Sequence, residues 1–367
     1  MKRRDFITKA TVGAAAGAAV TAAPYVAAAT PTVRWRMAAS WPTSLDTIFS
    51  GAKLIADRVS ELTGGKFQIR TYAAGELVGG LQVFDAVQQG TVEAGHTASY
   101  YYIGKNPSLA FDTTLPFGFN TRQQNAWMYH GGGNELVNKE VFSDFGIISL
   151  PGGNTTCQMG GWFRKEVPNL AALKGIKMRI PGFGGKVMAT MGVNVQTLAA
   201  PEIYPALERG VIDATEWVGP YDDEKLGFYQ VAKNYYAPSW WEPNAQLSVY
   251  FNRKAYDKLP KEYQQALHTA SAEANLRMIA HYDAVNPPAL ARLLAKGVKL
   301  HTFSDDIMTE AQKNAFAIYE DLASKDKTWN KVYTPWKKFR DMEYAWFNVA
   351  EQGFAKFAFP TVSQDKL

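Results

Sequence analysis

The chain has 367 residues, of which 47% are hydrophobic and 13% aromatic, and its formal net charge is +5. This length and apolar content are enough to bury a large core and predict two domains. Four basic residues and one acidic residue in the first thirty positions account for +3 of the charge, so the rest is close to neutral and indicates no nucleic-acid partner or anionic membrane surface.

The N-terminus has the anatomy of an export signal. Arg3 and Arg4 are followed by a weakly apolar run of small residues that ends in three alanines at 27–29. This order predicts a twin-arginine signal peptide over residues 1–29 and a mature protein in the periplasm. An amphipathic first helix is the alternative. No later stretch is long and apolar enough to span a bilayer.

The next hundred residues alternate between strand and helix patterns. Strands are indicated by apolar and polar residues in alternation, and helices by apolar residues at i, i+3, i+4 spacing with a glycine at the end. The predicted order is strand 32–40, helix 43–65, strand 66–74, helix 80–90 and strand 91–99. This rhythm predicts a mainly parallel sheet flanked by helices.

The same rhythm returns later, with strand 175–182, helices 185–193 and 200–210, and strand 211–217. AVQQGTVEA at 86–94 and ALERGVIDA at 206–214 share the pattern A-x-x-x-G-x-[VI]-[ED]-A. We interpret the match as two similar α/β lobes, although helix ends of this kind also recur by chance. Ligands of open α/β sheets bind beyond the carboxyl ends of the strands. Residues 96–102 and 216–221 are therefore expected to face each other across a cleft.

The last third of the chain is predicted to be helical. Residues 261–297 form one helix with a break at Pro287-Pro288, and residues 309–354 form a long tail. The tail is rich in large aromatic side chains, among them Trp329, Trp336, Tyr344, Trp346 and Phe347. So much aromatic surface must be covered by the lobes or by a second copy of the chain.

Several catalytic motifs fail on spacing. HGGG at 130–133 lacks the G-x-S-x-G turn of an esterase and is interpreted as a loop that ends a helix. GFGGK at 182–186 fails the Walker spacing, and its glycines fit a helix N-terminus that approaches a small anion. The five histidines show no zinc spacing. The single cysteine, Cys157, allows no intrachain disulfide, and we expect a buried structural thiol.

A few polar residues remain as candidates. Arg179 ends an apolar strand, where its planar fork suits either a ligand carboxylate or a structural ion pair. Glu216 has no second group at catalytic spacing, so a hard cation fits it better than general acid or base chemistry. Side-chain oxygens of Gln158 and Glu242 and the carbonyl of Trp217 belong to the same oxygen-rich set.

With these segments in view, the sequence resembles the extracytoplasmic solute receptors of tripartite ATP-independent periplasmic (TRAP) transporters. TYAAGEL at 71–77, LKGIKMRIPG at 173–182 and ALERGVIDATEW at 206–217 carry the resemblance. TTCQMGGWF at 155–163, ATEWVGPYDDE at 214–224 and SWWEPNAQ at 239–246 are similar to the branch that binds 2-oxo acids or lactate together with a cation.

The resemblance implies roles for individual residues. Arg179 matches the arginine that pairs with the ligand carboxylate, and Gln158, Glu216, Trp217 and Glu242 match the surroundings of the cation, which is sodium or calcium. The resemblance also implies that Gln158 and Trp217 contact the ligand. Candidates to enclose the carbon atoms of the ligand are Trp217, Tyr100, Tyr101 and Phe183.

The resemblance also implies the architecture and the partners. The fold is expected to be the α/β two-lobe periplasmic-binding-protein fold with long C-terminal helices. The expected divisions are lobe I at 30–153 with 250–310 returning to it, lobe II at 154–249, and a dimerising extension at 311–367. The partners implied are a small monocarboxylate such as pyruvate or lactate, the TRAP membrane subunits and a second copy of the chain.

The function expected is capture and delivery, with no enzymatic activity. Two alternatives remain open from the sequence. The first is a receptor of the same family for a dicarboxylate or sugar acid, although the second positive group that a dicarboxylate needs is not evident in the motifs. The second is an exported enzyme that uses Glu216 as an acid or base.

Overall fold

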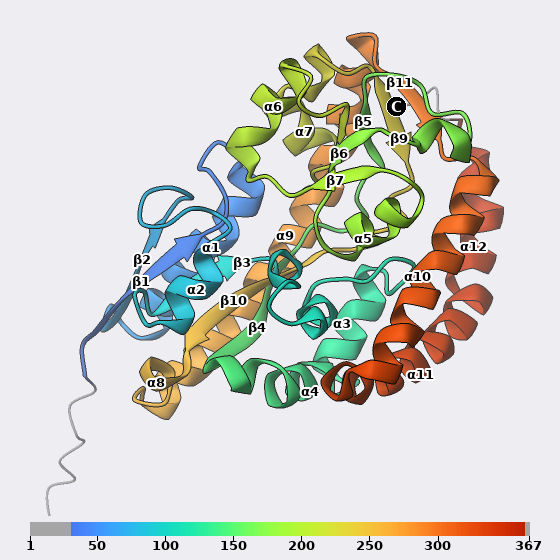
Figure 1. The fold of residues 1–367 in the computed structure, drawn as a ribbon. Helices are drawn as coiled ribbons and strands as arrows, with labels where there is room; N and C mark the ends of the chain where they lie inside the picture. The colour runs from blue at the N-terminus through green and yellow to red at the C-terminus, as the bar shows by residue number, and fades with distance from the viewer. Residues whose placement is uncertain (1–30, 364–367) are drawn as a thin grey trace, which may run out of the picture. The chain divides into compact units, whose positions relative to one another are not determined.

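The computed structural model describes residues 31–363, and its first sheet, sheet A, has five strands in the order β2-β1-β3-β10-β4 (Figure 1). β1 lies parallel to β2 and β3, whereas β10 lies antiparallel to β3 and β4. The strands are β1 Val33–Ala39, β2 Phe67–Tyr72, β3 Ala94–Thr97, β4 Ile147–Asn154 and β10 Gln246–Asn252. The predicted β-α-β-α-β rhythm is thereby confirmed. The signal peptide predicted at 1–29 lies outside the described residues.

The helices of the first half connect these strands. Of the five apolar positions predicted for this helix, α1 buries Ile48, Ala52, Ile55 and Val59, whereas Leu62 in its last turn is 46% exposed. The helix ends just before two glycines with positive φ. The helices are α1 Asp46–Leu62, α2 Val83–Gln88, α3 Thr121–Tyr129 and α4 Gly133–Glu140. Short 3₁₀ turns are η1 Ser99–Tyr102, η2 Pro107–Asp112 and η3 Phe142–Phe145. The HGGG motif joins α3 to α4, as expected of a loop that ends a helix.

The second sheet, sheet B, has six strands in the order β11-β9-β5-β8-β6-β7. Its strands are β5 Gly161–Phe163, β6 Lys177–Arg179, β7 Asn194–Gln196, β8 Ala214–Thr215, β9 Asn234–Ala237 and β11 Lys299–Thr302. Its helices are α5 Gly182–Thr190, α6 Ala200–Glu208 and α7 Pro220–Leu226, with η4 Leu170–Leu173 and η5 Phe228–Gln230. The second strand–helix repeat is therefore present, although the strand expected at 211–217 pairs over two residues only.

The two sheets are joined by a pair of segments that run side by side, residues 155–160 from β4 to β5 and residues 238–245 from β9 to β10. We call these segments the crossing pair. The Thr155 N–H donates to the Ala245 carbonyl at 3.0 Å, and the Gln158 N–H donates to the Glu242 carbonyl at 3.2 Å. β4 already pairs with β10, and β5 with β9. The crossing pair thus continues one two-stranded ribbon from sheet A into sheet B.

Sheet membership differs from the expected lobe boundaries at two places. β10 begins at Gln246, slightly before the expected return to lobe I at 250. β11 at Lys299–Thr302 pairs in parallel with β9 of sheet B, although residues 250–310 were assigned to lobe I. The reason is that the helix before β11 carries the chain back to the far edge of sheet B. The division into lobes otherwise stays a prediction.

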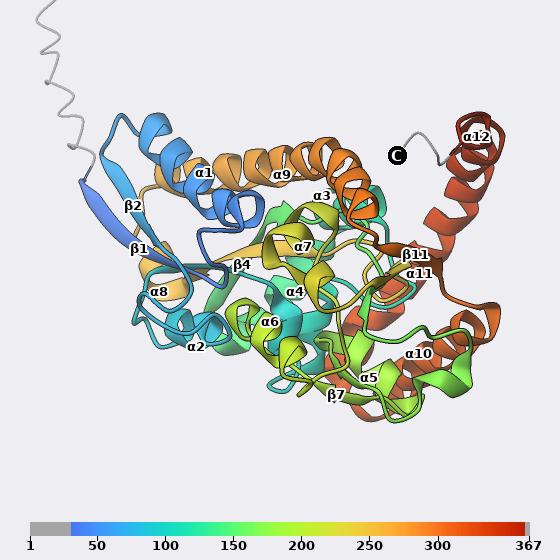
Figure 2. The same cartoon turned by 90° about the horizontal axis from the view of Figure 1, so that it is seen from above.

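One long helix, α9 Lys261–Ala295, follows the short helix α8 Arg253–Tyr256. It runs alongside α1 in Figure 2 and also contacts β4 and α7. The expected break at Pro287-Pro288 is wrong, because the helix continues through both prolines. Each proline removes one backbone hydrogen bond. The buried side chains of Ala289 and Leu293 in the following turns hold the helix against its neighbours.

The C-terminal helices are α10 Asp305–Lys325, α11 Lys327–Val349 and α12 Glu351–Ala358, followed by η6 Phe359–Thr361 (Figure 1). Trp329 and Trp336 are buried against the chain's own residues, where both rings pack on Phe111. Trp346 remains 59% exposed and Phe357 84% exposed. The lobes therefore cover only the first half of the aromatic tail. None of the helices at 31–363 is both long and apolar enough to cross a membrane.

Candidate functional site

Arg179 lies at the carboxyl end of β6, and its side chain is buried, with 1% exposed. Its Nη1 donates to the Glu216 side chain at Oε1 and to the Glu216 carbonyl at 3.1 Å, while Nε donates to the Leu198 carbonyl at 3.2 Å. Nη2 has no hydrogen-bond partner among the described residues. The structural ion pair considered from the sequence is thus present, and it leaves one N–H edge of the guanidinium free.

Glu216 follows β8, which places it beside Arg179 because β6 and β8 are parallel neighbours. Its side chain is fully buried, and Oε2 has no partner among the described residues. Burial raises the pKa of Glu216, the charge of Arg179 lowers it and the charge of Asp223 raises it, and the result is a pKa of about 7. A free carboxylate oxygen in this position can accept a proton or bind a cation.

Gln158 and Glu242 lie opposite each other in the crossing pair. The Gln158 amide nitrogen Nε2 donates to the Thr155 hydroxyl at 3.0 Å, which leaves Oε1 free. Glu242 is 3% exposed and has a free Oε2. Burial and the charge of Glu216 raise the pKa of Glu242 well above its usual range. The Met159 N–H donates to the Val218 carbonyl at 3.0 Å, so the crossing pair lies against the segment that follows β8.

Aromatic side chains surround these polar groups. Tyr100 and Tyr101 come from η1 after β3, and their rings meet edge to face at 4.9 Å. Burial raises the pKa of Tyr101 to a value above the ordinary range, and the charge of Arg179 opposes that shift. The Trp217 ring lies 5.2 Å from the Arg179 guanidinium. These three aromatic residues therefore lie next to the charged groups, and their role in enclosing a ligand stays a prediction.

Phe183 occupies a different environment from the other three. Its ring packs at 5.1 Å from Trp329 and 5.7 Å from Tyr319, which belong to the C-terminal helices. It therefore contributes to the core beneath α5, and its role as a wall of the site stays a prediction. The neighbouring Gly182, with φ of 63°, begins α5 close to the Tyr100 side chain, so the N-terminus of this helix lies near the site.

Sequence reasoning missed Trp41. It follows the carboxyl end of β1, and its ring contacts Tyr101 at 6.1 Å and Trp217 at 6.3 Å. The Trp41 indole N–H donates to His96 Nδ1 at 2.9 Å, and His96 Nε2 donates to the Gly152 carbonyl at 3.1 Å. Its position directly after a parallel strand was the available signal, because such positions line ligand sites.

The prediction for Cys157 is wrong, because its side chain is exposed. Thr156 adopts a left-handed conformation with φ of 62°, and Asn154 Oδ1 accepts the Thr156 N–H at 2.9 Å. Neighbouring side chains in the extended segment that follows point to opposite sides. The turn directs Gln158 inward, and its neighbour Cys157 therefore faces outward.

The free polar atoms form a chemically coherent set of one guanidinium N–H edge and three oxygens. They are Arg179 Nη2, Glu216 Oε2, Gln158 Oε1 and Glu242 Oε2, and the indole nitrogen of the neighbouring Trp217 also has no partner among the described residues. Buried polar atoms without partners are costly, and in folded proteins such atoms usually have a ligand, an ion or water as partner. An N–H edge suits a carboxylate, and carboxylate and amide oxygens suit a hard cation. Residues 31–363 hold no cluster of three or more His, Cys, Asp and Glu side chains arranged for a metal ion.

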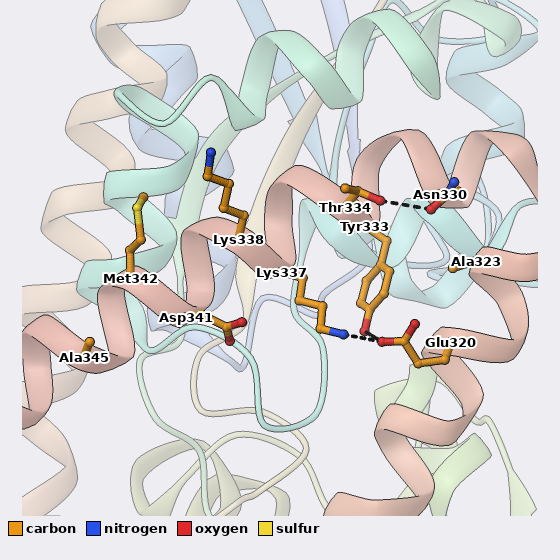
Figure 3. A pocket seen from close by; sticks show the side chains of 10 residues that line it. All are labelled: Glu320, Ala323, Asn330, Tyr333, Thr334, Lys337, Lys338, Asp341, Met342 and Ala345. Carbon is orange, nitrogen blue, oxygen red and sulfur yellow. Dashed lines mark hydrogen bonds and ion pairs between the residues drawn. The ribbon is translucent and has the colours of Figure 1, made fainter.

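A pocket of about 720 Å³ between α10 and α11 is a different feature (Figure 3). Tyr333 and Lys337 both contact Glu320 there, so these three side chains already have partners. None of the predicted site residues lines it. We therefore place the candidate site at the crossing pair.

Two sheets joined by a crossing pair, with a buried set of unpaired polar atoms between them, define a two-lobe binding protein. The chain matches the family model for the bacterial extracellular solute-binding proteins, family 7, over residues 37–326. The chain belongs to this family, which is a solute-binding transport family and not an enzyme family.

Relatives with known ligands support the family assignment. The chain is 54% identical to the monocarboxylate 2-oxoacid-binding periplasmic protein of Nostoc sp., over 98% of this chain and 99% of that protein. A TRAP transporter solute-binding protein from Bordetella bronchiseptica is 46% identical, with a TM-score of 0.89 over 90% of this chain and 98% of its own. That protein crystallised as a mixed-occupancy dimer with copurified calcium and picolinate. A protein from Pseudoalteromonas atlantica with bound sodium and pyruvate is 38% identical, with a TM-score of 0.86 over 89% and 99% of the two chains.

Proposed function

We propose that this protein is the periplasmic receptor of a TRAP transporter and that it captures a small 2-oxo monocarboxylate, such as pyruvate, together with a hard cation. The observation that carries the proposal is the set of four unpaired buried atoms on Arg179, Glu216, Gln158 and Glu242. A carboxylate satisfies the N–H edge, and a cation satisfies the three oxygens. The receptor then passes the acid to the membrane subunits.

In this proposal each residue has a separate role. Arg179 binds the carboxylate of the acid through Nη2 while Glu216 keeps the guanidinium oriented. Glu216, Gln158 and Glu242 bind the cation with their side chains, and Trp217 contributes its carbonyl. Tyr100, Tyr101 and Trp217 enclose the carbon atoms, with Phe183 as the remaining candidate.

The chemistry of the relatives' ligands supports a chelating acid. Pyruvate carries a second oxygen, and picolinate a ring nitrogen, on the carbon next to the carboxylate. Each molecule can therefore offer a cation two donor atoms in a five-membered ring. Lactate offers the same arrangement through its hydroxyl group. A site whose cation coordinates both of these ligand atoms binds 2-oxo and 2-hydroxy acids in preference to simple carboxylates.

The charges of the site are consistent with a cation. Arg179 has one positive charge, whereas Glu216, Glu242 and the bound acid together have three negative charges when all are ionised. Calcium brings this sum to zero, and sodium does so when one carboxyl group is protonated. A dicarboxylate or sugar acid would add negative charge or further hydroxyl groups, and within residues 31–363 no second unpaired cationic atom accompanies Arg179 Nη2 in this set.

The receptor is proposed to act as a dimer in the periplasm, delivered there by a twin-arginine signal at residues 1–29. The extension at 311–367 supplies the dimer contact, because its exposed aromatic side chains have no cover within residues 31–363. Hinge closure of lobe I on lobe II about the crossing pair would enclose the acid.

Native mass spectrometry of the protein as purified tests the proposal. We expect a bound mass equal to a 2-oxo acid plus calcium or sodium, and loss of the acid after treatment with a chelator if the ion is calcium. For a sodium site, exchange into potassium buffer replaces the chelator. A receptor that retains the acid after all cations are removed would contradict the proposed chelation.

A further inference from the structure

Residues 115–118 form a strained β-turn, which we call the Phe117 turn. The Gly118 N–H donates to the Leu115 carbonyl at 2.9 Å, and Pro116 occupies the second position of the turn. Phe117 occupies the third position with φ of 54°. A turn with proline second and a left-handed residue third normally has glycine at the third position, because a side chain is strained there. A bulky phenylalanine at this position requires an explanation.

On one side, the C-terminal helices hold the Phe117 turn. The Tyr319 hydroxyl of α10 donates to the Pro116 carbonyl at 3.1 Å, and Arg340 Nε of α11 donates to the Phe117 carbonyl at 2.9 Å. The Tyr344 hydroxyl lies 2.8 Å from the Phe117 carbonyl and 2.6 Å from the Gly118 carbonyl, so its proton is shared between them. Three consecutive carbonyls thus accept from two helices, and such redundancy is what maintains a strained backbone.

On the other side, the Phe117 turn contacts the crossing pair. The Phe117 N–H donates to the Trp240 carbonyl at 2.8 Å, and the two rings stack at 5.5 Å with 13° between their planes. Trp240 lies two residues before Glu242, whose carbonyl accepts the Gln158 N–H. A shift of Trp240 therefore moves two of the oxygen donors proposed for the cation.

We propose that Phe117 is a positioning residue for the cation site, held in place by Arg340 and Tyr344. This inference rests on the proposed function. Glycine would satisfy the backbone of the turn without strain, but only an aromatic ring can stack on Trp240. The Phe117 side chain occupies a strained position because its ring holds the crossing pair where Glu242 and Gln158 face Glu216. The C-terminal helices thereby influence a site that they do not touch.

Two substitutions of one residue test this inference. Phe117→Gly relieves the backbone strain and removes the ring, whereas Phe117→Tyr keeps the ring. Phe145→Ala removes another half-buried ring, one that packs on Phe84, and serves as the matched control. Pyruvate affinity is measured by calorimetry at subsaturating and at saturating calcium, or sodium if the wild type does not respond to calcium. Thermal unfolding is followed in parallel.

We expect Phe117→Gly to weaken pyruvate binding about five- to tenfold at subsaturating cation, from loss of one aromatic pair, and to approach wild type at saturating cation. Phe117→Tyr and Phe145→Ala should bind as wild type does at both concentrations. An unchanged pyruvate affinity in Phe117→Gly, or a loss of affinity that persists at saturating cation, would overturn this inference but not the proposed function. A wild type that binds no pyruvate with either cation would overturn the proposed function, and the inference with it.

Discussion

Arg179 and Glu216 form a buried ion pair in which each partner keeps one polar atom unused. Nη1 donates to Oε1, while Nη2 and Oε2 have no partner among the described residues. A purely structural pair between two side chains so completely buried would be expected to satisfy both ends, because desolvated charges are costly. The arrangement instead holds each group in place and leaves each with capacity for a ligand.

The first prediction concerns Arg179. Arg179→Ala should abolish pyruvate binding, because it removes the only unpaired cationic atom identified at the site and leaves Glu216 without its counter-charge. Breaking a buried pair costs about 3–5 kcal/mol, so the apo protein should also unfold more easily. Calorimetry and thermal unfolding measure both effects. Arg164→Ala is the control, since the Arg164 side chain donates to the Leu207 carbonyl of α6 and makes no contact with Glu216 among the described hydrogen bonds. Near-normal affinity in Arg179→Ala would refute the assignment.

The second prediction concerns the cation. Glu216→Gln keeps the shape of the side chain but removes its charge, so we expect the bound cation to be lost from the purified protein. Pyruvate affinity should then no longer depend on calcium or sodium and should be at least about tenfold weaker, since hydrogen bonds to charged groups are worth about 1.5–3 kcal/mol. Metal analysis of the purified variant provides the measurement. The exposed Glu208→Gln is the matched control, and a cation requirement equal to that of wild type in Glu216→Gln would contradict the role.

A third prediction follows from a contact between α1 and α7. Asp46 at the start of α1 accepts from the Tyr221 hydroxyl at 3.1 Å and pairs with Lys225, and both partners belong to α7, which follows β8 of sheet B. Asp46→Asn should raise the dissociation rate of pyruvate about two- to fivefold and leave the association rate nearly unchanged, because exposed pairs contribute little and act on the closed state. Stopped-flow fluorescence measures both rates. High salt should reproduce the effect in wild type, and Asp57→Asn within α1 should not.

His96 makes stability depend on pH. Burial lowers the pKa of His96 to about 4 from its usual 6.5, and the neutral ring is needed to accept from Trp41. An unfolded chain binds the proton between these two values and the folded chain does not, so the contribution of His96 to the free energy of unfolding falls as the pH falls from 6.5 to 4, whereas the raised pKa values of Glu216 and Asp222 contribute with the opposite sign. The full effect is about 3 kcal/mol, at about 1.4 kcal/mol per pH unit. Urea unfolding from pH 7 to 4 measures it. His96→Gln should lose this contribution, so its free energy of unfolding should fall less than that of wild type between pH 7 and pH 4. An equal change in both proteins would assign the pH dependence to other groups.

The dimer prediction uses the exposed half of the tail. Phe354 is 67% exposed and Phe357 84% exposed, which is unusual for aromatic side chains on a helix. Phe354→Lys combined with Phe357→Lys should convert a dimer to a monomer in sedimentation experiments while thermal stability remains unchanged. A wild type that sediments as a monomer, or a double variant that remains dimeric, would contradict the proposed contact.

The strand–helix rhythm was predictable because its periodicity is local. The stripe of Ile48, Ala52, Ile55 and Val59 marks α1 directly in the sequence, and burial of that face confirms it. Pro287-Pro288 misled the prediction of α9, because packing of the turns beyond the prolines comes from residues distant in the chain. The same applies to β11, whose partner strand lies more than sixty residues earlier.

The site was predictable only in part. Arg179 ends a strand and Glu216 follows one, so the sequence could place each residue at the carboxyl end of a strand. Their ion pair depends on the parallel pairing of β6 with β8. Gln158 and Glu242 are 84 residues apart, and only the crossing pair brings them together. Trp41 was missed because an aromatic residue after a strand is as often part of the core. The outward orientation of Cys157 depends on the left-handed backbone conformation of Thr156, and the residue types of this segment do not predict that conformation.

The two prolines of α9 bear on how the molecule can move. Proline has no N–H, so the carbonyls of Asp283 and Ala284 receive no helical hydrogen bond from Pro287 and Pro288 in any conformation. α9 contacts α1 and β4 before this point, and the Tyr221 N–H donates to Asn286 Oδ1 beside it. The hydrogen-bond ladder of α9 is therefore already interrupted at the two prolines, and the helix can bend there more easily than elsewhere. Bending there breaks no hydrogen bond that the helix possesses at these two positions, so α9 opposes the opening of the receptor only weakly. The free energy that keeps the receptor closed must then come mainly from the ligand, with a small contribution from the contacts of Asp46 with α7.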